Sequence, residues 1–374
     1  MEYKYPLSTP PLDEAEIDAV CKVIRSKWLC MGDVTSEFER KFATMLGVKH
    51  AFAVSNCTAA LHLANLALGI GPGDEVICPA LTFVATANAS KYTGADVVFA
   101  DSVSSEDLTI DVDDIISKIT HNTKAISVVH YAGFSCNMVP IIDLASRMGI
   151  RVIEDCAHSP FVKCDMNDST KFVGTIGDVG CFSFFANKNM TTGEGGMVTT
   201  NSDEIAEKIR LLRSHGMTST THNRHKTHTI GYDVVCLGYN YRIDEIRSAI
   251  GIVQLDKIEF NNRKRRLSRE RYINGLKDNP NITIPFISRD IEYSAPHIMP
   301  VIVKNSPDIV RARLMGAGIQ VSKHYELIPS FTLYKDVGFK SKIENIDGLM
   351  SLPLDQGLTF DDVDFICSVV NNAD

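Results

Sequence analysis

The sequence lacks long hydrophobic runs: no stretch of about eighteen apolar residues occurs, and residues 1–6 lack the apolar core of a signal peptide. It also lacks a Cys-x-x-Cys pair, although it contains ten cysteines. These are scattered, and Cys78, Cys181 and Cys367 lie in apolar runs, which is typical of reduced packing residues. We therefore expect a cytoplasmic protein without a membrane segment or a disulfide framework.

An excess of positive charge is lacking as well. The 374 residues include 38 basic and 46 acidic side chains, a formal net charge of −8, which argues against general affinity for nucleic acid. One basic run, residues 263–266 followed by Arg269 and Arg271, lies in a polar helical pattern and predicts a solvent-exposed helix face. The composition has no low-complexity bias and is typical of a globular protein, whose length predicts about two domains at roughly 150 residues each.

Neither of the common nucleotide-binding loops, Walker A or GxGxxG, is present. Short apolar segments alternate with helical patterns, which predicts an α/β fold with a largely parallel sheet and helices on both faces. Ligands of such sheets bind at the carboxyl ends of the strands. We expect strands at 50–54, 75–78, 95–100, 125–130 and 150–153, and helices at 13–32, 35–46, within 55–69, 82–89, 113–119 and 140–147.

The chain is organised around residues 180–196, where a short aromatic strand runs into Lys188 and a glycine-rich turn follows. Apolar neighbours and close backbone lower the pKa of a lysine by desolvation, which an amine needs in order to form a Schiff base with a carbonyl group. Pyridoxal phosphate chemistry requires such a lysine. The local pattern also fits an exposed lysine at a strand end, so the neighbouring residues must decide.

Other strand ends carry further candidate groups. Small polar residues after the first strand offer free N–H groups for a phosphate, although Ser55 or Thr58 also fits a simple N-cap. Asp155 ends a buried strand, where a carboxylate needs a partner such as a protonated pyridine nitrogen; a helix N-cap is the alternative. Phe83 fits a ring that covers a flat cofactor, or a core residue. His158 fits a partner of a cofactor substituent, or the cap of a turn.

These motifs occur in a recognisable order: residues 55–64, 79–86, 130–133, 154–158, 182–184 with 188–189, 193–196 and 238–245. The ordered set resembles the sugar aminotransferases of the DegT/StrS type, which belong to the fold type I pyridoxal phosphate enzymes. The resemblance extends from about Pro6 to about Val363. It implies a three-layer α/β/α large domain with a mostly parallel sheet, predicted at residues 1–245, and a smaller C-terminal α+β domain at 246–374.

The resemblance implies catalytic roles for Lys188 and Asp155 and cofactor-binding roles for Phe83 and His158. Lys188 matches the lysine that carries the cofactor, and Asp155 matches the partner of the pyridine nitrogen. Phe83 matches the aromatic side chain stacked on the ring, and His158 lies where the family usually has glutamine or histidine near the ring hydroxyl. Lys188 matters most, because related sugar dehydratases have histidine at this position and cannot hold the cofactor in this way.

The resemblance also implies a phosphate site shared between subunits. Ser183 and the backbone of Cys57 and Thr58 match this site, and Asn240 matches an asparagine that reaches the phosphate from the neighbouring subunit. An obligate homodimer with shared active sites follows from that match. The sequence departs from the family at Cys57, which replaces a glycine and leaves the backbone less free, and at residues 163–171, which indicate a longer polar loop.

The segment 213–228 has the most unusual composition of the chain. Its histidines at 222, 225 and 228 are spaced by three, but no carboxylate or cysteine nearby completes a ligand set, so we predict no metal site. We expect a mobile active-site loop instead. Its cations Arg224, His225 and His228 are predicted to help bind the glutamate carboxylates or the diphosphate of a sugar nucleotide.

Residues 242–274 predict a long helix that crosses from the large domain to the small one. Its predicted apolar side is formed by Ile243, Ile246, Ile250, Val253 and Leu255. Beyond it we expect strands at 293–303 and 318–321 and helices at 308–315 and 360–370. His324 and Tyr325 follow a strand and match a family position near the sugar, although a packed surface pair fits as well.

The sequence therefore predicts a ping-pong aminotransferase. L-Glutamate is expected to donate its amino group through pyridoxal phosphate, with Lys188 as general base and Asp155 keeping the ring nitrogen protonated. The expected acceptor is a nucleotide-linked keto-deoxysugar, aminated at C3 or C4 for amino-sugar and polysaccharide biosynthesis. Two alternatives stay open: an acceptor such as a keto-cyclitol or another non-nucleotide keto sugar, and a cofactor-binding regulatory protein, against which the acidic charge argues.

Overall fold

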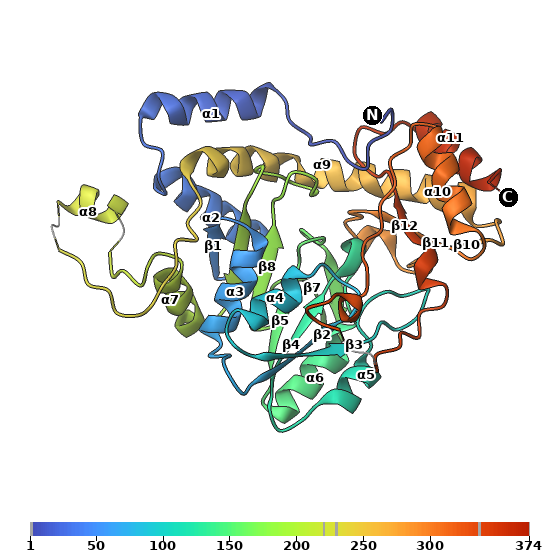
Figure 1. Cartoon of the computed structure of the whole chain (residues 1–374). Helices are drawn as coiled ribbons and strands as arrows, with labels where there is room; N and C mark the ends of the chain where they lie inside the picture. Colours follow the sequence, from blue (N-terminus) through green and yellow to red (C-terminus); the bar gives the residue numbers. More distant parts are fainter. Residues whose placement is uncertain (1–2, 220, 229–230, 336–337, 374) are drawn as a thin grey trace.

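The computed structural model describes residues 3–219, 221–228, 231–335 and 338–373. Its central sheet (Figure 1) consists of β1 (His50–Val54), β2 (Glu75–Pro79), β3 (Asp96–Ala100), β4 (Thr123–Val129), β5 (Arg151–Asp155), β8 (Val179–Ser183) and β9 (Gly196–Thr200). The order is β1-β9-β8-β5-β4-β2-β3. Neighbours from β8 to β3 are parallel, and β9 is the reversed strand. The predicted mostly parallel α/β sheet is confirmed.

Helices cover both faces of this sheet because its strands are apolar on both sides. One face packs against α2 (Asp33–Leu46), α5 (Val112–Lys118) and α6 (Met138–Met148). The other packs against α3 (Cys57–Ala67), α4 (Ala85–Lys91) and α7 (Asp203–Leu212). The predicted three layers are present. The carboxyl ends of β4, β5 and β8 therefore meet at one edge, between the helical layers.

A long helix joins this unit to the C-terminal part of the chain. α9 (Glu245–Leu276) packs on α1 (Glu14–Ser26), on α2 and on α11 (Phe360–Asn371). Beyond it lies a three-stranded sheet of β10 (Ile282–Thr283), β11 (Met299–Val303) and β12 (Leu349–Leu352), with α10 (Pro307–Gly316) beside it. Figure 1 shows α9 running across the upper part of the molecule, below α1, from α2 to α11. The boundary expected after residue 245 stays a prediction.

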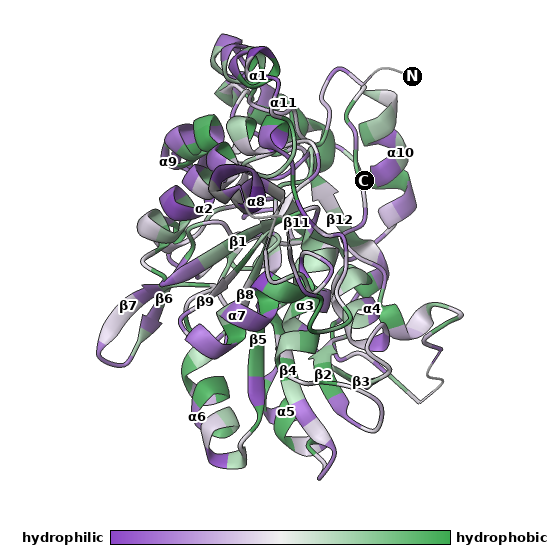
Figure 2. Ribbon diagram, turned by 90° about the vertical axis from the view of Figure 1, so that its left-hand side faces the viewer, coloured by the Kyte–Doolittle hydropathy of each residue, from purple (hydrophilic) through white to green (hydrophobic). Residues whose placement is uncertain are grey.

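Some expected elements differ from the structure. α1 ends at Ser26, with Lys27 in the left-handed conformation, so it does not reach Gly32. The expected polar loop is a hairpin of β6 (Lys163–Met166) and β7 (Ser169–Phe172), whose two-residue turn, Asn-Asp, suits a tight hairpin. Figure 2 shows this largely hydrophilic hairpin extending from the body of the molecule. The C-terminal strands are also shorter: β11 begins only at residue 299, and Ile319 forms an isolated bridge rather than a strand.

The basic run in α9 is partly buried, which corrects the predicted solvent-exposed face. Arg265 and Arg269 are 0% exposed and Arg266 is 8% exposed. Burial of a guanidinium is costly unless its N–H groups are satisfied. Here Arg265 donates to two backbone carbonyls, those of His297 (3.1 Å) and Leu354 (2.6 Å). The arginines therefore join α9 to the C-terminal segments.

The buried side of α9 also differs from the predicted aliphatic side. Of that set Ile243 and Leu255 are buried, whereas the intervening aliphatic residues are only partly buried. Gly251 is buried, and glycine is required here because a Cβ atom would lie 2.5 Å from the ring of Phe38 in α2. Small residues thus let the two helices approach closely. Among the helices that the structure describes, none is long and apolar enough to cross a membrane.

Candidate active site

A cavity of about 460 Å³ lies at the carboxyl ends of β4, β5 and β8 and at the N-terminus of α3. Most of the side chains predicted from the sequence line it. They are Cys57, Thr58, Phe83, Asp155, His158, Ser183, Lys188, His324 and Tyr325. The cavity therefore brings together residues that are far apart in the sequence, such as Cys57 and Tyr325, which are separated by 268 positions.

Lys188 lies on the turn after β8, five positions beyond the last strand residue, Ser183. Its backbone N–H donates to the carbonyl of Phe185 at 3.0 Å. Its Nζ lies 3.3 Å from Nε2 of His297. Burial lowers the pKa of Lys188 to about 8, while the charge of Asp155 acts in the opposite direction. Lys188 is therefore not an ordinary surface lysine: its amine is partly neutral near physiological pH, as a nucleophile or base requires.

Asp155 is the last residue of β5 and is 4% exposed. Its Oδ2 accepts a hydrogen bond from the hydroxyl of Thr86 (2.8 Å), and its Oδ1 accepts from the N–H of Ala157 (3.0 Å). Burial raises the pKa of this carboxyl group. No helix begins here among the described residues, so the N-cap alternative fails. Each oxygen retains a lone pair for a cationic N–H donor in the cavity.

His158 and Phe83 lie on the walls of the cavity. Nδ1 of His158 accepts from the backbone N–H of Ala132 (3.2 Å), so its ring proton lies on Nε2, which donates to the hydroxyl of Tyr325 (2.8 Å). Burial lowers the pKa of His158 well below its usual range. Phe83 is 55% exposed, so it is a wall of the cavity and not a core residue. Its ring centroid lies 5.7 Å from that of Tyr325.

The start of α3 supplies backbone N–H groups. Asn56 is the N-cap, because its Oδ1 accepts from the N–H of Ala59 at 2.8 Å, so neither residue expected in that role, Ser55 or Thr58, fills it. Cys57 and Thr58 are the first two helical residues, whose N–H groups have no partner within a helix. Cys57 has a helical backbone, which a residue other than glycine adopts without strain. The helix dipole adds partial positive charge at this wall.

The four other predicted residues do not line this cavity. Asn240 is exposed and pairs with Ser214 in an isolated bridge. The expected mobile loop contains α8 (Thr221–Thr227), which lies apart from the sheet in Figure 1. Arg224 lies over the ring of Tyr232, and His225 and His228 are exposed. Within one chain, these side chains therefore lie outside the cavity, and their role in substrate binding stays a prediction.

Sequence reasoning missed three residues next to the site: Thr86, Asn189 and His297. Thr86 holds Asp155, and His297 contacts Lys188. Asn189 donates to the carbonyl of Ala295 (3.0 Å) and faces Nδ1 of His297 (3.2 Å). Asn189 belongs to the motif at 188–189, but the sequence assigned it no role. His297 gave no signal, because the segment around it resembles an ordinary strand.

A group of potential metal ligands lies near the site, but its histidine and carboxylate already form hydrogen bonds within the protein. His130, Glu154 and Cys156 are buried together. Nδ1 of His130 accepts from the N–H of Cys136, so Nε2 donates to Oε2 of Glu154 at 3.0 Å. Glu154 also accepts three backbone N–H groups from the turn before β8. These bonds identify Glu154 as the anchor of that turn.

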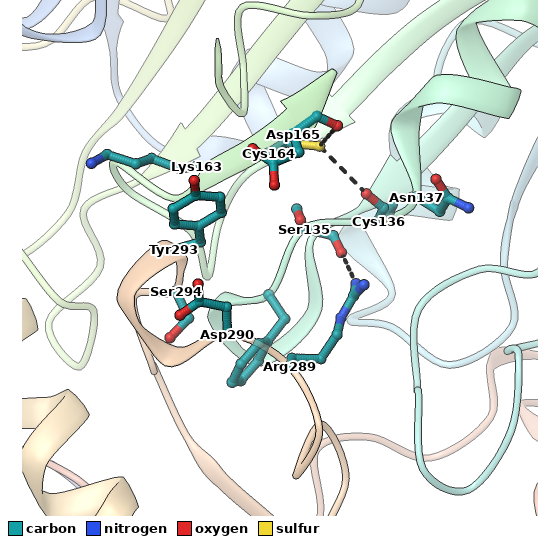
Figure 3. A pocket seen from close by; sticks show the side chains of 11 residues that line it. Ser135, Cys136, Asn137, Lys163, Cys164, Asp165, Arg289, Asp290, Tyr293 and Ser294 are labelled. Carbon is teal, nitrogen blue, oxygen red and sulfur yellow. Dashed lines mark hydrogen bonds between the residues drawn. The ribbon is translucent and has the colours of Figure 1, made fainter. Parts of the chain in front are cut away.

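A second cavity, of about 280 Å³, lies between the hairpin β6–β7 and the segment around Tyr293. Figure 3 shows Lys163 and Tyr293 on one side and Arg289, which donates to the carbonyl of Ser135, on the other. None of the predicted site residues lines it, and Lys163 is exposed rather than desolvated. We therefore place the candidate active site in the first cavity.

Comparison with known proteins agrees with this geometry. GDP-perosamine synthase of Caulobacter vibrioides is 43% identical over 254 residues, which cover 68% of this chain and 65% of that protein. The structure of PseC of Helicobacter pylori, an aminotransferase involved in the biosynthesis of pseudoaminic acid, matches with a TM-score of 0.90 and 31% identity over 100% and 99% of the two chains.

A further solved structure, the PLP-form of Spr1654 from Streptococcus pneumoniae, matches with a TM-score of 0.88 and 27% identity over 100% of this chain and 98% of that one. The sequence pattern of the DegT/DnrJ/EryC1/StrS aminotransferase family matches residues 10–371. The resemblance found in the sequence motifs is thereby confirmed. This chain belongs to the DegT/DnrJ/EryC1/StrS aminotransferase family.

Proposed function

We propose that this protein uses pyridoxal phosphate to transfer the amino group of L-glutamate to a nucleotide-linked keto-deoxysugar, in amino-sugar and polysaccharide biosynthesis. Family membership confirms the predicted sugar aminotransferase. The cofactor agrees with the PLP-form of a relative, and the substrate class with a relative named for a GDP-linked product. The observation that carries the proposal is a desolvated lysine, Lys188, facing a buried carboxylate, Asp155, across one cavity.

The residues around the cavity fit this cofactor. Lys188 offers an amine for its aldehyde, and Asp155 offers a buried acceptor for its ring nitrogen. Phe83 offers an open aromatic face for the ring. The N–H groups of Cys57 and Thr58, with Ser183, offer donors for the phosphate; these roles are part of the proposal. When bound, pyridoxal phosphate supplies an electron sink that stabilises negative charge on the carbon bearing the transferred nitrogen.

Lys188 is the proposed proton carrier of both half-reactions. Burial lowers its pKa to about 8, so its amine can accept a proton from one carbon and return it to a neighbouring atom near neutral pH. Asp155 is held by Thr86 and Ala157, so it can keep a proton on the ring nitrogen without moving. His158 points its Nε2 proton toward Tyr325, where a ring hydroxyl could also accept it.

The sugar side of the site is proposed to include His324 and Tyr325. Both line the cavity, and burial lowers the pKa of His324 to about 4, so this histidine is a neutral hydrogen-bonding group. The contribution of Arg224, His225, His228 and Asn240 is proposed to come from a second copy of the chain, because these residues lie outside the cavity of their own chain. Arg224 and the histidines would supply donors for anionic oxygens of the substrates.

An exposed apolar segment supports the proposed homodimer. Tyr232, Val234, Val235 and Leu237 are between 54% and 86% exposed and precede Asn240 in sequence. Adjacent exposed apolar side chains are typical of interaction surfaces. A cytoplasmic location is also proposed: all ten cysteines are unpaired in the structure, which fits a reducing compartment.

An isotope-transfer assay tests the proposal. Purified protein loaded with cofactor is incubated with ¹⁵N-labelled L-glutamate and either a nucleotide-linked keto-deoxysugar or a keto-cyclitol. Mass spectrometry then measures the incorporation of ¹⁵N into the product. We expect the label in the nucleotide-linked product and none with Lys188→Ala. Label only in the cyclitol would select the non-nucleotide alternative, and label in neither acceptor would favour a regulatory protein.

A further inference from the structure

The amine of Lys188 has a polar neighbour that the family motifs did not point to. His297 lies in the segment before β11, and its Nε2 is 3.3 Å from Nζ of Lys188. The imidazole is 3% exposed, and its ring centroid lies 4.5 Å from that of His158. The contact brings the C-terminal segment directly to the reactive amine.

The direction of the hydrogen bond between Lys188 and His297 can be derived from neighbouring backbone carbonyls, because a carbonyl oxygen can only accept. Nδ2 of Asn262 donates to the carbonyl of Pro160 (3.3 Å), so Oδ1 of Asn262 is an acceptor. Nδ2 of Asn189 donates to that Oδ1 (2.9 Å) and to the carbonyl of Ala295 (3.0 Å). Oδ1 of Asn189 must then face a donor, and it lies 3.2 Å from Nδ1 of His297.

His297 therefore carries its ring proton on Nδ1 and a lone pair on Nε2. A lone pair can only accept, so the N–H of Lys188 is the donor in the contact between them. The backbone of His297 is also fixed: its N–H donates to the carbonyl of Ala132 (3.0 Å), and its carbonyl accepts from the buried Arg265. The ring cannot turn without breaking this set of bonds.

The charged and titratable groups around Lys188 and His297 favour the neutral form of the His297 imidazole. Lys188, His158, Arg265 and His324 all face His297. Burial, followed by the charge of Lys188, lowers the pKa of His297 well below its usual range. Cys57 and Asp155 face Lys188 from α3 and β5. The imidazole thus stays an acceptor over the pH range in which Lys188 titrates.

We propose that His297 is a positioning residue: its Nε2, fixed as an acceptor through Asn189 and Asn262, holds one N–H of Lys188 so that the lone pair of the amine is left for the cavity. The proposal rests on the proposed function, because it assigns a role to the amine that transfers protons. An amine held in this way would be oriented whenever it is free of the cofactor. Orientation of a reacting group before reaction is a large part of catalysis.

The first test is the position of the ring proton. Full-length protein labelled with ¹⁵N-histidine is studied by two-bond ¹H–¹⁵N correlation NMR without cofactor, and the signal of His297 is assigned by its loss in His297→Gln. We expect the proton on Nδ1 and no protonation of the ring between pH 6 and 9. A proton on Nε2 would overturn the proposal, because Nε2 would then be a donor.

The second test compares His297→Phe, which removes the acceptor, with His297→Gln, which retains an acceptor oxygen. In cofactor-free protein, the acylation rate of Lys188 is followed against pH by mass spectrometry. We expect the midpoint to fall by about one pH unit in the Phe variant, because an acceptor stabilises the ammonium form, and to stay near the native value in the Gln variant. His62→Phe, a buried histidine elsewhere, is the control.

The same variants are then given L-glutamate after loading with cofactor. We expect the rate of the half-reaction to fall about tenfold or more in His297→Phe at an unchanged half-saturating glutamate concentration, and to recover within about threefold in His297→Gln. Equal midpoints and equal rates in all three proteins would overturn the proposal. The NMR and acylation tests use no substrate, so they can fail while the aminotransferase function holds, or succeed if that function fails.

Discussion

At the scale of single residues, the site depends on burial of ionisable groups. Burial lowers the pKa of Lys188 and raises the pKa of Asp155, so each is moved toward its neutral form. A protonated pyridine ring bound in the cavity beside Asp155 would favour the charged form of this carboxylate. Bond partners from the protein fix Asp155 in place beforehand.

Replacement of Asp155 by asparagine tests this role. The amide has nearly the same shape but no charge, so cofactor binding should survive while the ring nitrogen loses its proton. We expect the half-reaction with L-glutamate to slow by about 100-fold or more. Stopped-flow absorbance measures the rate, with Thr86→Val as control, for which we expect less than about tenfold. A rate for Asp155→Asn within about threefold of the native rate would refute the assignment.

The lowered pKa of Lys188 also predicts a pH-dependent stability. Between pH 8 and the ordinary lysine value of 10.5, the unfolded chain binds more protons than the folded one, so the contribution of this group to stability rises with pH in that window. Below pH 8 the folded chain holds a partly desolvated cation at Lys188, which costs stability. We expect cofactor-free Lys188→Met to be more stable than the native protein by about 1 to 3 kcal/mol at pH 7, and the gain to shrink toward pH 10.5.

Urea unfolding at both pH values measures this difference. The exposed Lys22→Met is the control, for which we expect a small change without pH dependence. A loss of stability at pH 7 in Lys188→Met would show that the amine is not desolvated in the folded chain.

At the scale of elements, the segment before β11 is held against the short helix η1 (Tyr131–Gly133). The N–H of Ala295 donates to the carbonyl of Gly133 (3.0 Å). Gly133 has a φ of +92°, and a Cβ atom there would lie 2.0 Å from the carbonyl oxygen of Ala295. That carbonyl is an acceptor for Asn189, the residue after Lys188. Gly133 therefore sets the distance between the sheet edge and the segment that carries His297.

Gly133→Ala should disturb both stability and the site. Left-handed strain alone costs an alanine about 1 to 2 kcal/mol, and the clash with Ala295 adds to it. We expect a loss of about 3 kcal/mol or more together with a slower glutamate half-reaction. Gly149→Ala, with a φ of +67° and no atom within 4 Å of its Cβ, is the matched control and should lose only about 1 kcal/mol. Equal losses in thermal unfolding would contradict this account.

The sequence predicted those elements whose structure is determined locally. The buried strands are short apolar runs. Asp155 ends β5 and Lys188 follows β8, so their meeting follows from the parallel pairing of these two strands. Buried Arg265 was not predictable, because its acceptors lie in segments 32 and 89 positions away. The contact of His297 with Lys188 spans 109 positions and depends on the C-terminal segment, whose packing no local pattern encodes.

At the scale of the whole molecule, four of the predicted site residues, Asn240, Arg224, His225 and His228, lie outside the cavity of their own chain. The cavity mouth includes exposed aromatic rings, Phe83 and Phe185, and the cations of the α8 region lie outside it. An apolar segment that ends near Asn240 is also exposed. In the proposed homodimer, the second copy would cover this segment and bring those polar groups to the site.

Leu237, at 86% exposed, is the residue with which to test association. A charge placed in an interface is desolvated without a partner, so we expect Leu237→Glu to weaken the dimer at least tenfold. Light scattering over a dilution series measures the mass. Leu333→Glu is the matched control, because Leu333 is 79% exposed but lies in another region. A monomeric native protein, or equal masses for both variants, would contradict the proposed surface.

The measurement that tests the central claim most directly is the absorbance spectrum of the cofactor-loaded protein during addition of L-glutamate, with Lys188→Ala as control. We predict that the band of the lysine-bound cofactor is replaced by that of pyridoxamine phosphate in the native protein, and that the variant never shows the lysine-bound band. A native spectrum that glutamate leaves unchanged would contradict the claim that Lys188 and Asp155 carry a glutamate-dependent transamination.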